Sequence, residues 1–444
     1  DQFLAKHSVR SQRSTDKGRD DVRAFSVPFD PPDVRVVVDN MFFEGTLQPV
    51  DIEGSASKLP EWANVGLKSD ANALGDLVAE GVKRVITDMP GPDSSHRDWS
   101  DFARRLGEII YRFNSLSAPQ ANGVQEQVHA LQRDADTRLT DWVSEHFADL
   151  PSLPAAKGPV MVHHVPRYLA MRRNAGEERI ALLVFDGLAM DQWFQIREHL
   201  AALAPNLIVE ENTCFAWLPT LTSVSRQALF SGLKPREFSD SIETTSKEPS
   251  LWARFWQENG LRKSEIFYRK SLKRTGQLEE LANALSQPSI KVAGIVVDMI
   301  DEIVHGAMLG KRGITGQIAE WCATGFLERL FFLLAEHGYQ IYLTADHGNV
   351  EAEGIGRLSQ GVVSDLRGER VRAYRSDALA ASVPDDIDAF RLDLAGLPAE
   401  FLPLYAGTRG AFVSKGDQIV AHGGISVEEL IVPFVKVSVE NEKQ

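Results

Sequence analysis

Apolar residues recur every three or four positions in the first third of the chain, a spacing that predicts two amphipathic helices. The first helix presents one set of large side chains on a single face: Trp99, Phe102, Leu106, Ile109, Ile110 and Phe113. The second presents Val128, Leu131, Ala135, Leu139 and Trp142. Both patterns need an apolar partner surface, so we expect these helices to pack against a larger core.

The pattern changes after residue 159, where continuous apolar runs of strand length alternate with helical stretches. The runs are "RIALLVF" (179–185), "VAGIVV" (292–297) and "YQIYLTA" (339–345). Helices are predicted over 188–204 and 316–338. Uninterrupted apolar strands are buried on both faces, which is typical of parallel sheets covered by helices. The chain therefore predicts an α/β fold with a parallel-sheet core and helices on both faces.

Three domain-level divisions follow from the changes in pattern. Residues 1–30 are polar and predict a flexible lead-in. Residues 31–158 predict a mixed strand and helix region that opens with a strand, a turn and a strand over 34–52, and the Pro-rich segment 150–159 marks its end. Residues 159–444 form the α/β domain. Within it, residues 348–420 are rich in glycine and charge, with short strand-like pieces such as "RVRAY", and predict a cap-like insertion.

Composition narrows the class of protein. The chain has 444 residues, of which 43% are hydrophobic and 25% charged, as in ordinary globular proteins. Its two cysteines form no CxxC motif, which favours a reducing, cytoplasmic setting. No apolar run reaches the roughly 18 residues of a membrane span, so no membrane association is expected. The chain begins with Asp1 and not Met, so we expect further residues upstream.

The net charge of −14 argues against binding nucleic acid over the whole surface. Local basic stretches remain at 268–274 and 171–174. Runs of this kind are usually solvated surface, but they could guide a polyanion locally.

Acidic and imidazole side chains gather where the predicted strands end. The three strands are followed directly by Asp186, Asp298 and Asp346, and His347 comes next to Asp346. In open parallel sheets, functional groups lie at the carboxyl ends of the strands. Further ligand types follow in Asp301, His305 and, near the end of the chain, His422.

Oxygen and imidazole ligands together suit zinc or manganese better than magnesium or calcium, and zinc is favoured. Three aspartates and three histidines exceed one tetrahedral site. They predict two divalent ions about 4 Å apart, the arrangement that clamps both oxygens in phosphoryl transfer. Asp301 is preferred to Asp298 because it lies four residues before His305 and shares a helix face with it, whereas Asp298 has the position of a helix cap. Six further histidines are interpreted as structural: His129, His146, His163, His164, His199 and His337.

A nucleophile is predicted in "LPTLTSVSRQALFSGLKP" (218–235), where helical periodicity begins at Val224. Thr222 or Ser223 then lies at the start of a short helix, where the dipole and free N–H groups favour an alkoxide. A plain helix cap is the alternative reading of the same residues.

These motifs resemble, in order, those of the alkaline phosphatase superfamily over residues 160–440: "VFDG", "PTLT" with "FSGLKP", "DEIVH", "ADHG" and "HGG". A closer resemblance is to the PglZ family of bacteriophage exclusion (BREX) defence systems. It is carried by "NMFFEGTLQPV", "PVMVHHVPRYLA", "LLVFDGLAMDQW" and "HGGISVEELIVPFV".

The resemblance implies a role for each residue. Asp186, Asp346 and His347 would bind one metal with the nucleophile, and Asp301, His305 and His422 would bind the other. Thr222, the second threonine of "PTxT", would be the nucleophile. Arg226 would contact substrate phosphate, or alternatively form a surface salt bridge.

Two departures from related branches bear on activity. Ser223-Val224 replaces the Pro-Asn that usually follows the nucleophile of the phosphodiesterase branch, which affects substrate contacts but not the metal ligands. Thr222 stands where sulfatases carry cysteine or serine, so sulfatase activity is not expected.

The leading hypothesis is a two-metal phosphodiesterase that acts on a nucleotide or nucleic acid in phage defence together with other defence-system proteins. A phosphomonoesterase or mutase acting on a small substrate is the alternative that uses the same site. A scaffold subunit of a BREX complex is the alternative from another class.

Overall fold

The computed structural model describes Met41 and residues 73–439, apart from 156, 205, 308, 359–367, 377, 379–382 and 384–386. Residues 77–444 form one compact unit. The predicted lead-in at 1–30 and the strands predicted over 34–52, Met41 excepted, lie outside the described residues. Among the residues described, no helix combines the length and the apolar character that crossing a bilayer requires.

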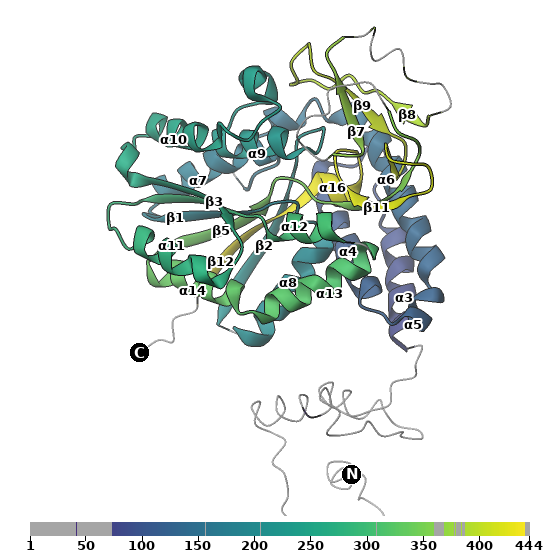
Figure 1. Ribbon diagram of the computed structural model, residues 1–444, viewed down its shortest axis with the longest axis horizontal. Coiled ribbons are helices and arrows are strands. Elements are labelled where there is room, and N and C mark those ends of the chain that lie inside the picture. The colour runs from purple at the N-terminus through teal and green to yellow at the C-terminus, as the bar shows by residue number, and fades with distance from the viewer. Residues whose placement is uncertain are drawn as a thin grey trace, which may run out of the picture. The chain divides into compact units, whose positions relative to one another are not determined.

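A six-stranded sheet in the order β2-β12-β5-β1-β4-β3 lies at the centre of this unit (Figure 1). Neighbours β5, β1, β4 and β3 pair in parallel, whereas β12 runs antiparallel to both β2 and β5. The predicted α/β fold with a mostly parallel sheet is thus confirmed, and β2, β3 and β12 are the strands that the prediction lacked. The bounds are β1 (Ile180–Phe185), β2 (Leu207–Phe215), β3 (Ile266–Leu272), β4 (Val292–Val297), β5 (Gln340–Ala345) and β12 (Ile431–Val439).

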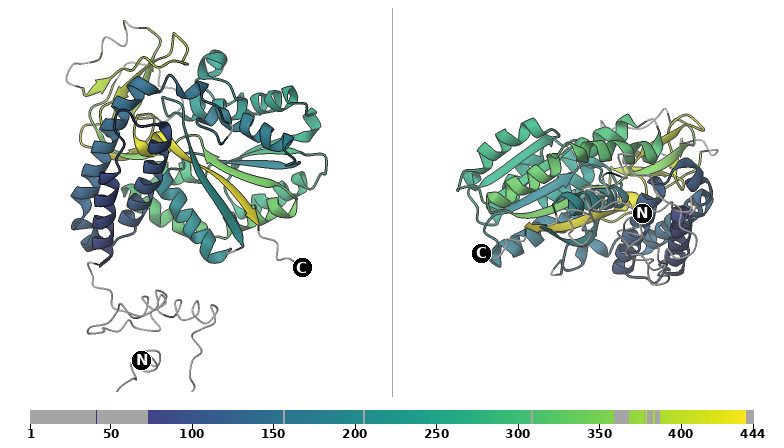
Figure 2. Two further views of the ribbon diagram at one scale, coloured as in Figure 1. Left: turned by 180° about the vertical axis from the view of Figure 1, so that it is seen from behind. Right: turned by 90° about the horizontal axis from the view of Figure 1, so that it is seen from below.

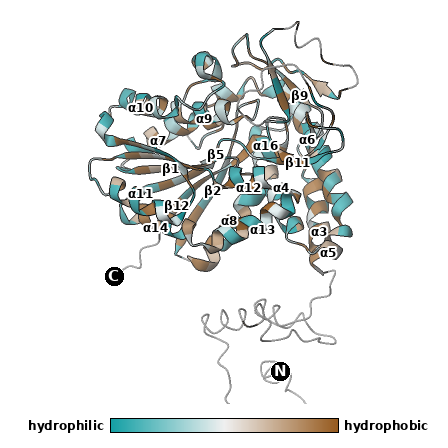
Figure 3. Ribbon diagram, in the orientation of Figure 1, coloured by the Kyte–Doolittle hydropathy of each residue, from teal (hydrophilic) through white to brown (hydrophobic). Residues whose placement is uncertain are grey.

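Helices cover both faces of the sheet, which explains why β1 and β4 are buried at every position and show no polar alternation. Figure 1 shows one layer above the strands and a second layer below them. The upper layer contains α7 (Val165–Asn174), α9 (Thr222–Ser231) and α10 (Glu248–Glu258). The lower layer contains α8 (Met190–Leu203), α11 (Leu278–Leu285), α13 (Gly310–Ala323) and α14 (Phe326–Glu336). Figure 3 shows that these helices carry hydrophobic and hydrophilic residues side by side, as amphipathic helices do.

The single helix predicted over 316–338 is wrong. Two helices, α13 and α14, occupy this segment, and they are separated at Gly325. Gly325 has φ +70°, a left-handed conformation that glycine adopts without steric cost. The apolar spacing continues across the break, so periodicity alone did not reveal it.

Four α-helices lie between residues 73 and 146, ahead of α7: α3 (Ala73–Thr87), α4 (His96–Asn114), α5 (Ala118–Asn122) and α6 (Gln125–His146). The predicted apolar faces of α4 and α6 are buried. A capping box between Ser95 and Asp98 begins α4. The residues of both helices belong to the same hydrophobic core as the central sheet, and α4 packs against α8.

Residues 348–420 contribute two small three-stranded sheets, which Figure 2 shows beside the central sheet. Their orders are β10-β6-β11 and β7-β9-β8. The strands are β6 (Val350–Gly354), β7 (Val371–Tyr374), β8 (Ala389–Phe390), β9 (Leu402–Ala406), β10 (Gly410–Ala411) and β11 (Gln418–Ala421). The short strand expected from "RVRAY" is β7. β11 ends immediately before His422, so this region delivers one predicted ligand.

The contact between α4 and α8 can be tested at Gly107. A Cβ at this position would lie 2.7 Å from Cβ of Met190, so Gly107→Ala forces the helices apart. We expect a loss of about 1–3 kcal/mol in the free energy of unfolding, measured by chemical denaturation. Gly316→Ala in α13 is the matched control, because no atom lies within 4 Å of its added methyl group. That variant should gain stability, by about 1 kcal/mol or less. If the two substitutions changed the free energy of unfolding equally, the close contact between α4 and α8 at Gly107 would be contradicted.

Candidate metal centre

The aspartates predicted at strand ends lie along the carboxyl edge of the central sheet. Asp186 directly follows β1, and Asp346 directly follows β5, its parallel neighbour. Asp301 and His305 lie on α12 (Met299–Gly306), the helix that follows β4. Because parallel strands end at the same edge, residues more than 100 positions apart in the chain meet there.

The structure gathers the six predicted ligands into two groups. The potential ligand atoms of Asp186, Asp346 and His347 all lie within 4.8 Å of one another, and so do those of Asp301, His305 and His422. The two groups adjoin, because the rings of His347 and His422 stack with centroids 4.0 Å apart. We call them the Asp346 group and the His422 group.

Each carboxylate of the Asp346 group has one oxygen bound by the protein and one left open. Asp346 Oδ1 accepts the N–H groups of Gly187 and His347, at 3.1 and 3.0 Å. Asp186 Oδ2 accepts a hydrogen bond from Arg226. Asp186 Oδ1 and Asp346 Oδ2 are buried and have no hydrogen-bond partner in the part of the chain that the structure describes. Two open carboxylate oxygens in a buried position are what a cation would satisfy.

The electrostatics of this group point the same way. Burial, followed by the charge of Asp186, raises the pKa of Asp346 well above its ordinary value. Two ionised carboxylates so close together repel one another unless a cation lies between them. A divalent ion therefore fits the residues present.

The two stacked histidines are held neutral, in the form that a metal would bind. A backbone carbonyl can only accept a hydrogen bond, so His347 Nδ1 donates to Gly348 and His422 Nδ1 donates to Thr220, both at 2.9 Å. In each ring this leaves Nε2 without a proton, so its lone pair can bind a metal, and in His347 this nitrogen is the one that Thr222 contacts. Burial lowers the pKa of His347 to about 4 and that of His422 to about 3, so both imidazoles are uncharged at neutral pH, as metal binding requires.

Asp301 belongs to the His422 group, whereas Asp298 belongs to neither group. Asp301 Oδ1 lies 3.0 Å from His305 Nε2, the contact expected of residues four apart on one helix face. Asp298 is the residue before α12, at the N-cap position. Burial and the charge of Asp186 raise its pKa, so it lies near the site without completing either group.

Thr222 faces the Asp346 group, and Ser223 does not. Thr222 is the first residue of α9, is half-buried, and places Oγ1 3.0 Å from His347 Nε2. The hydroxyl of Ser223 is buried and donates to the carbonyl of Ile242 at 2.6 Å. The geometry therefore favours Thr222 over Ser223 as a nucleophile.

Arg226 does not form the surface salt bridge considered for it, and its contact with substrate phosphate stays a prediction. It is not a surface residue, because only 5% of it is exposed, and its hydrogen bonds go to carboxylates of the protein. It donates to Asp186 and, through Nε at 2.8 Å, to Glu248. Tyr268 completes the network by donating to Glu248 at 2.6 Å. The network fixes one oxygen of Asp186 and leaves the other free for a cation.

Sequence reasoning missed Glu248 and Tyr268. Neither follows a predicted strand, and no spacing relates them to the ligands. The histidines interpreted as structural lie in neither group of the described residues, and several bind backbone carbonyls. Such contacts hold His146 to Pro92, His164 to Pro151 and His337 to Leu333.

A mostly parallel sheet with aspartate and histidine ligands at its carboxyl edge defines an alkaline-phosphatase-like protein. Residues 167–437 match the family model of the BREX system PglZ alkaline phosphatase-like domain, and the chain belongs to this family. No curated protein matches the chain.

Solved structures similar to this chain include murine ectonucleotide pyrophosphatase / phosphodiesterase 5. The two are 12% identical over 58% of this chain and 87% of that one, with a TM-score of 0.43. The human ectonucleotide pyrophosphatase / phosphodiesterase 5 is 11% identical over the same shares, with a TM-score of 0.40.

Substitutions at the two aspartates near α12 test the composition of the His422 group. Asp301→Ala removes a carboxylate from the group, so we expect the protein to retain one divalent ion after dialysis instead of two. Asp298→Ala is the matched control, because it removes the same carboxylate three residues away and should leave both ions bound. The measurement is the metal content per chain by atomic emission. If Asp298→Ala lost an ion and Asp301→Ala did not, Asp298 and not Asp301 would belong to the His422 group.

Proposed function

We propose that this protein is a two-metal phosphodiesterase that cleaves a nucleotide or nucleic-acid phosphodiester in phage defence, with Thr222 as the nucleophile. The observation that carries the proposal is the Thr222 hydroxyl, 3.0 Å from His347 Nε2 and beside two adjoining groups of aspartate and histidine. Membership of the PglZ family supports the superfamily chemistry and the defence role, alongside other proteins of the system.

Asp186, Asp346 and His347 would hold one divalent ion, and Asp301, His305 and His422 the other. The mixed oxygen and nitrogen donors suit zinc, or manganese as the second choice. When bound, the ions supply positive charge that favours the ionised form of the hydroxyl and stabilises the phosphoryl oxygens.

The residues of the chain supply the nucleophile and its position. Thr222 lies at the N-terminus of α9, where unpaired N–H groups and the helix dipole favour negative charge. Its oxygen attacks phosphorus in line, the Thr222 Oγ1–P bond forms, and the bond from phosphorus to the leaving oxygen breaks as that oxygen takes a proton. Water then attacks the phosphothreonine, releases the phosphoryl product and restores the hydroxyl.

The charge of the site favours a diester over a monoester. A monoester carries a second negative charge, which needs an additional cation. Arg226, a buried cation bonded to this site, is already matched by Asp186 and Glu248. It therefore supplies no free charge, and the singly charged diester is the better fit.

The nucleophile is tested with Thr222→Ala on a chromogenic phosphodiester and on the matching monoester, with metal content checked in each sample. We expect diester cleavage to fall by about 10³-fold or more, because no neighbouring hydroxyl replaces Thr222. Thr222→Ser keeps an oxygen in place and should retain much of the activity. Ser223→Ala is the control at the adjacent hydroxyl, which points to Ile242, and should cleave at close to the wild-type rate.

Other outcomes contradict separate parts of the proposal. If Thr222→Ala cleaved the diester as fast as the wild type, the nucleophile would be water and not Thr222. A faster rate on the monoester would favour a phosphomonoesterase or mutase. No turnover of either ester by the metal-loaded wild type would contradict phosphodiesterase activity on simple esters and favour the scaffold role.

A further inference from the structure

One buried glutamate contacts the chain next to both ligand groups. Glu429 lies on the short helix α16 (Val427–Leu430) and is completely buried. Its backbone carbonyl accepts the N–H of Gly348, which follows His347 in the chain, at 2.9 Å. Its side-chain Oε1 accepts the N–H of Gly424, two residues after His422, also at 2.9 Å. Glu429 therefore bridges one loop from each group.

Both bridged glycines lie where no side chain would fit. A Cβ on Gly348 would come 1.9 Å from the carbonyl oxygen of Glu428, and one on Gly424 would come 2.5 Å from Nε of Arg370. The two loops are therefore packed closely against α16 and its partner Arg370, and have little freedom to move away from them.

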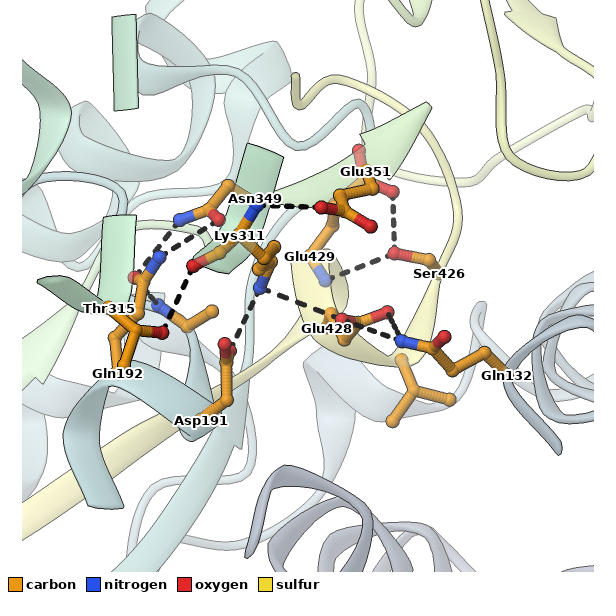
Figure 4. Close-up of polar contacts among 12 residues, drawn as sticks. Gln132, Asp191, Gln192, Lys311, Thr315, Asn349, Glu351, Ser426, Glu428 and Glu429 are labelled. Carbon is orange, nitrogen blue, oxygen red and sulfur yellow. Dashed lines mark hydrogen bonds and ion pairs between the residues drawn. The ribbon is translucent and has the colours of Figure 1, made fainter. Parts of the chain in front are cut away.

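The carboxylate of Glu429 is itself held in place. Ser426 Oγ donates to Oε2 at 2.7 Å and accepts the backbone N–H of Glu429 at 3.2 Å (Figure 4). Arg370, of which only 1% is exposed, places Nε 3.3 Å from Oε1 and donates its backbone N–H to the carbonyl of His422 at 3.2 Å. The guanidinium of Arg370 lies against the buried carboxyl group, and together with Ser426 it keeps Glu429 oriented toward Gly424.

We propose that Glu429 is a positioning residue that sets His422 in register with Asp346 and His347. The inference rests on the two-metal site proposed above. Because its side chain contacts the His422 loop and its backbone contacts the Asp346 loop, a side-chain substitution releases only the first contact. The loss of metal affinity should therefore be confined to the His422 group.

Glu428 is the matched control. It is the adjacent residue, is also buried and also carries a carboxylate, but Figure 4 shows this carboxylate directed at Gln132 and Lys311. Its third partner is Arg409, at 2.8 Å. Glu428→Gln removes a buried charge from helix-packing contacts without touching either glycine, so it should lower stability and leave metal affinity unchanged.

The test isolates each group with a background substitution and titrates zinc by calorimetry. His422→Ala leaves the Asp346 group intact, and Asp346→Ala leaves the His422 group intact. In the Asp346→Ala background, Glu429→Ala should weaken zinc binding by about 10–100-fold, the usual effect of losing a partner that orients a metal ligand. Glu429→Gln keeps an oxygen for the Gly424 N–H and should recover most of the loss. In the His422→Ala background, Glu429→Ala should leave zinc binding unchanged.

Equal weakening in both backgrounds, or no weakening in either, would overturn the role of Glu429. If circular dichroism shows that Glu429→Ala does not fold, Ser426→Ala takes its place, because it releases Oε2 without leaving Arg370 unpaired. That variant should weaken only the His422 group, to a smaller extent. Two zinc ions bound in both backgrounds would instead refute the two-metal site itself, and a metal-content measurement on these backgrounds distinguishes this failure from that of Glu429.

Discussion

The burial of two neighbouring carboxyl groups at the carboxyl edge of the sheet is the constraint on which this site depends. Asp186 and Asp346 are both buried beside one another, and removing an ionised carboxylate from water costs several kcal/mol per ion. Arg226 compensates part of this charge through one oxygen of Asp186. The remaining open oxygens, Asp186 Oδ1 and Asp346 Oδ2, are positioned to accept a cation. A cation bound as proposed above would relieve the repulsion between the two carboxylates, so metal binding would also stabilise the fold.

Strand β12 is what allows the two ligand groups to meet. The Asp346 group belongs to the central sheet, whereas His422 follows β11 of a small separate sheet. β12 pairs antiparallel with β5, so the chain entering β12 passes the carboxyl end of β5, and α16 lies immediately before it. The backbone hydrogen bond from Gly348 N–H to the carbonyl of Glu429 continues the contact between these two segments beyond the last residue pair of β5 and β12. An antiparallel strand in a mostly parallel sheet thus brings a ligand from outside the sheet to the ligands at its edge.

Most of the fold and the types of residue at the candidate site could be predicted from short stretches of the sequence. A strand that is buried on both faces is recognisable as an apolar run, and a metal site is recognisable by its aspartates and histidines. β1, β4 and β5 could be predicted from uninterrupted apolar runs, Asp186 and Asp346 from their place directly after β1 and β5, and Asp301 from its spacing to His305. Gly325 could not be recognised as a helix break, since the apolar spacing passes through it. The partners of Arg226 and the role of Glu429 depend on contacts between segments far apart in the chain. No spacing encodes these contacts, so they appear only when the sheet order is known.

In the proposed site, the charges also determine the order in which the metal ions and the substrate would bind. The six residues include three aspartates, whose carboxylates are negative when they bind a metal, and the lowered pKa values of His347 and His422 keep those rings neutral. A phosphodiester, itself an anion, is repelled by this arrangement and by a chain whose net charge is −14. In the two-metal site proposed above, two divalent ions would bring four positive charges and reverse the sign of the site locally. Metal binding would then precede substrate binding. Attraction for the phosphate would be confined to the carboxyl edge of the sheet, next to Thr222.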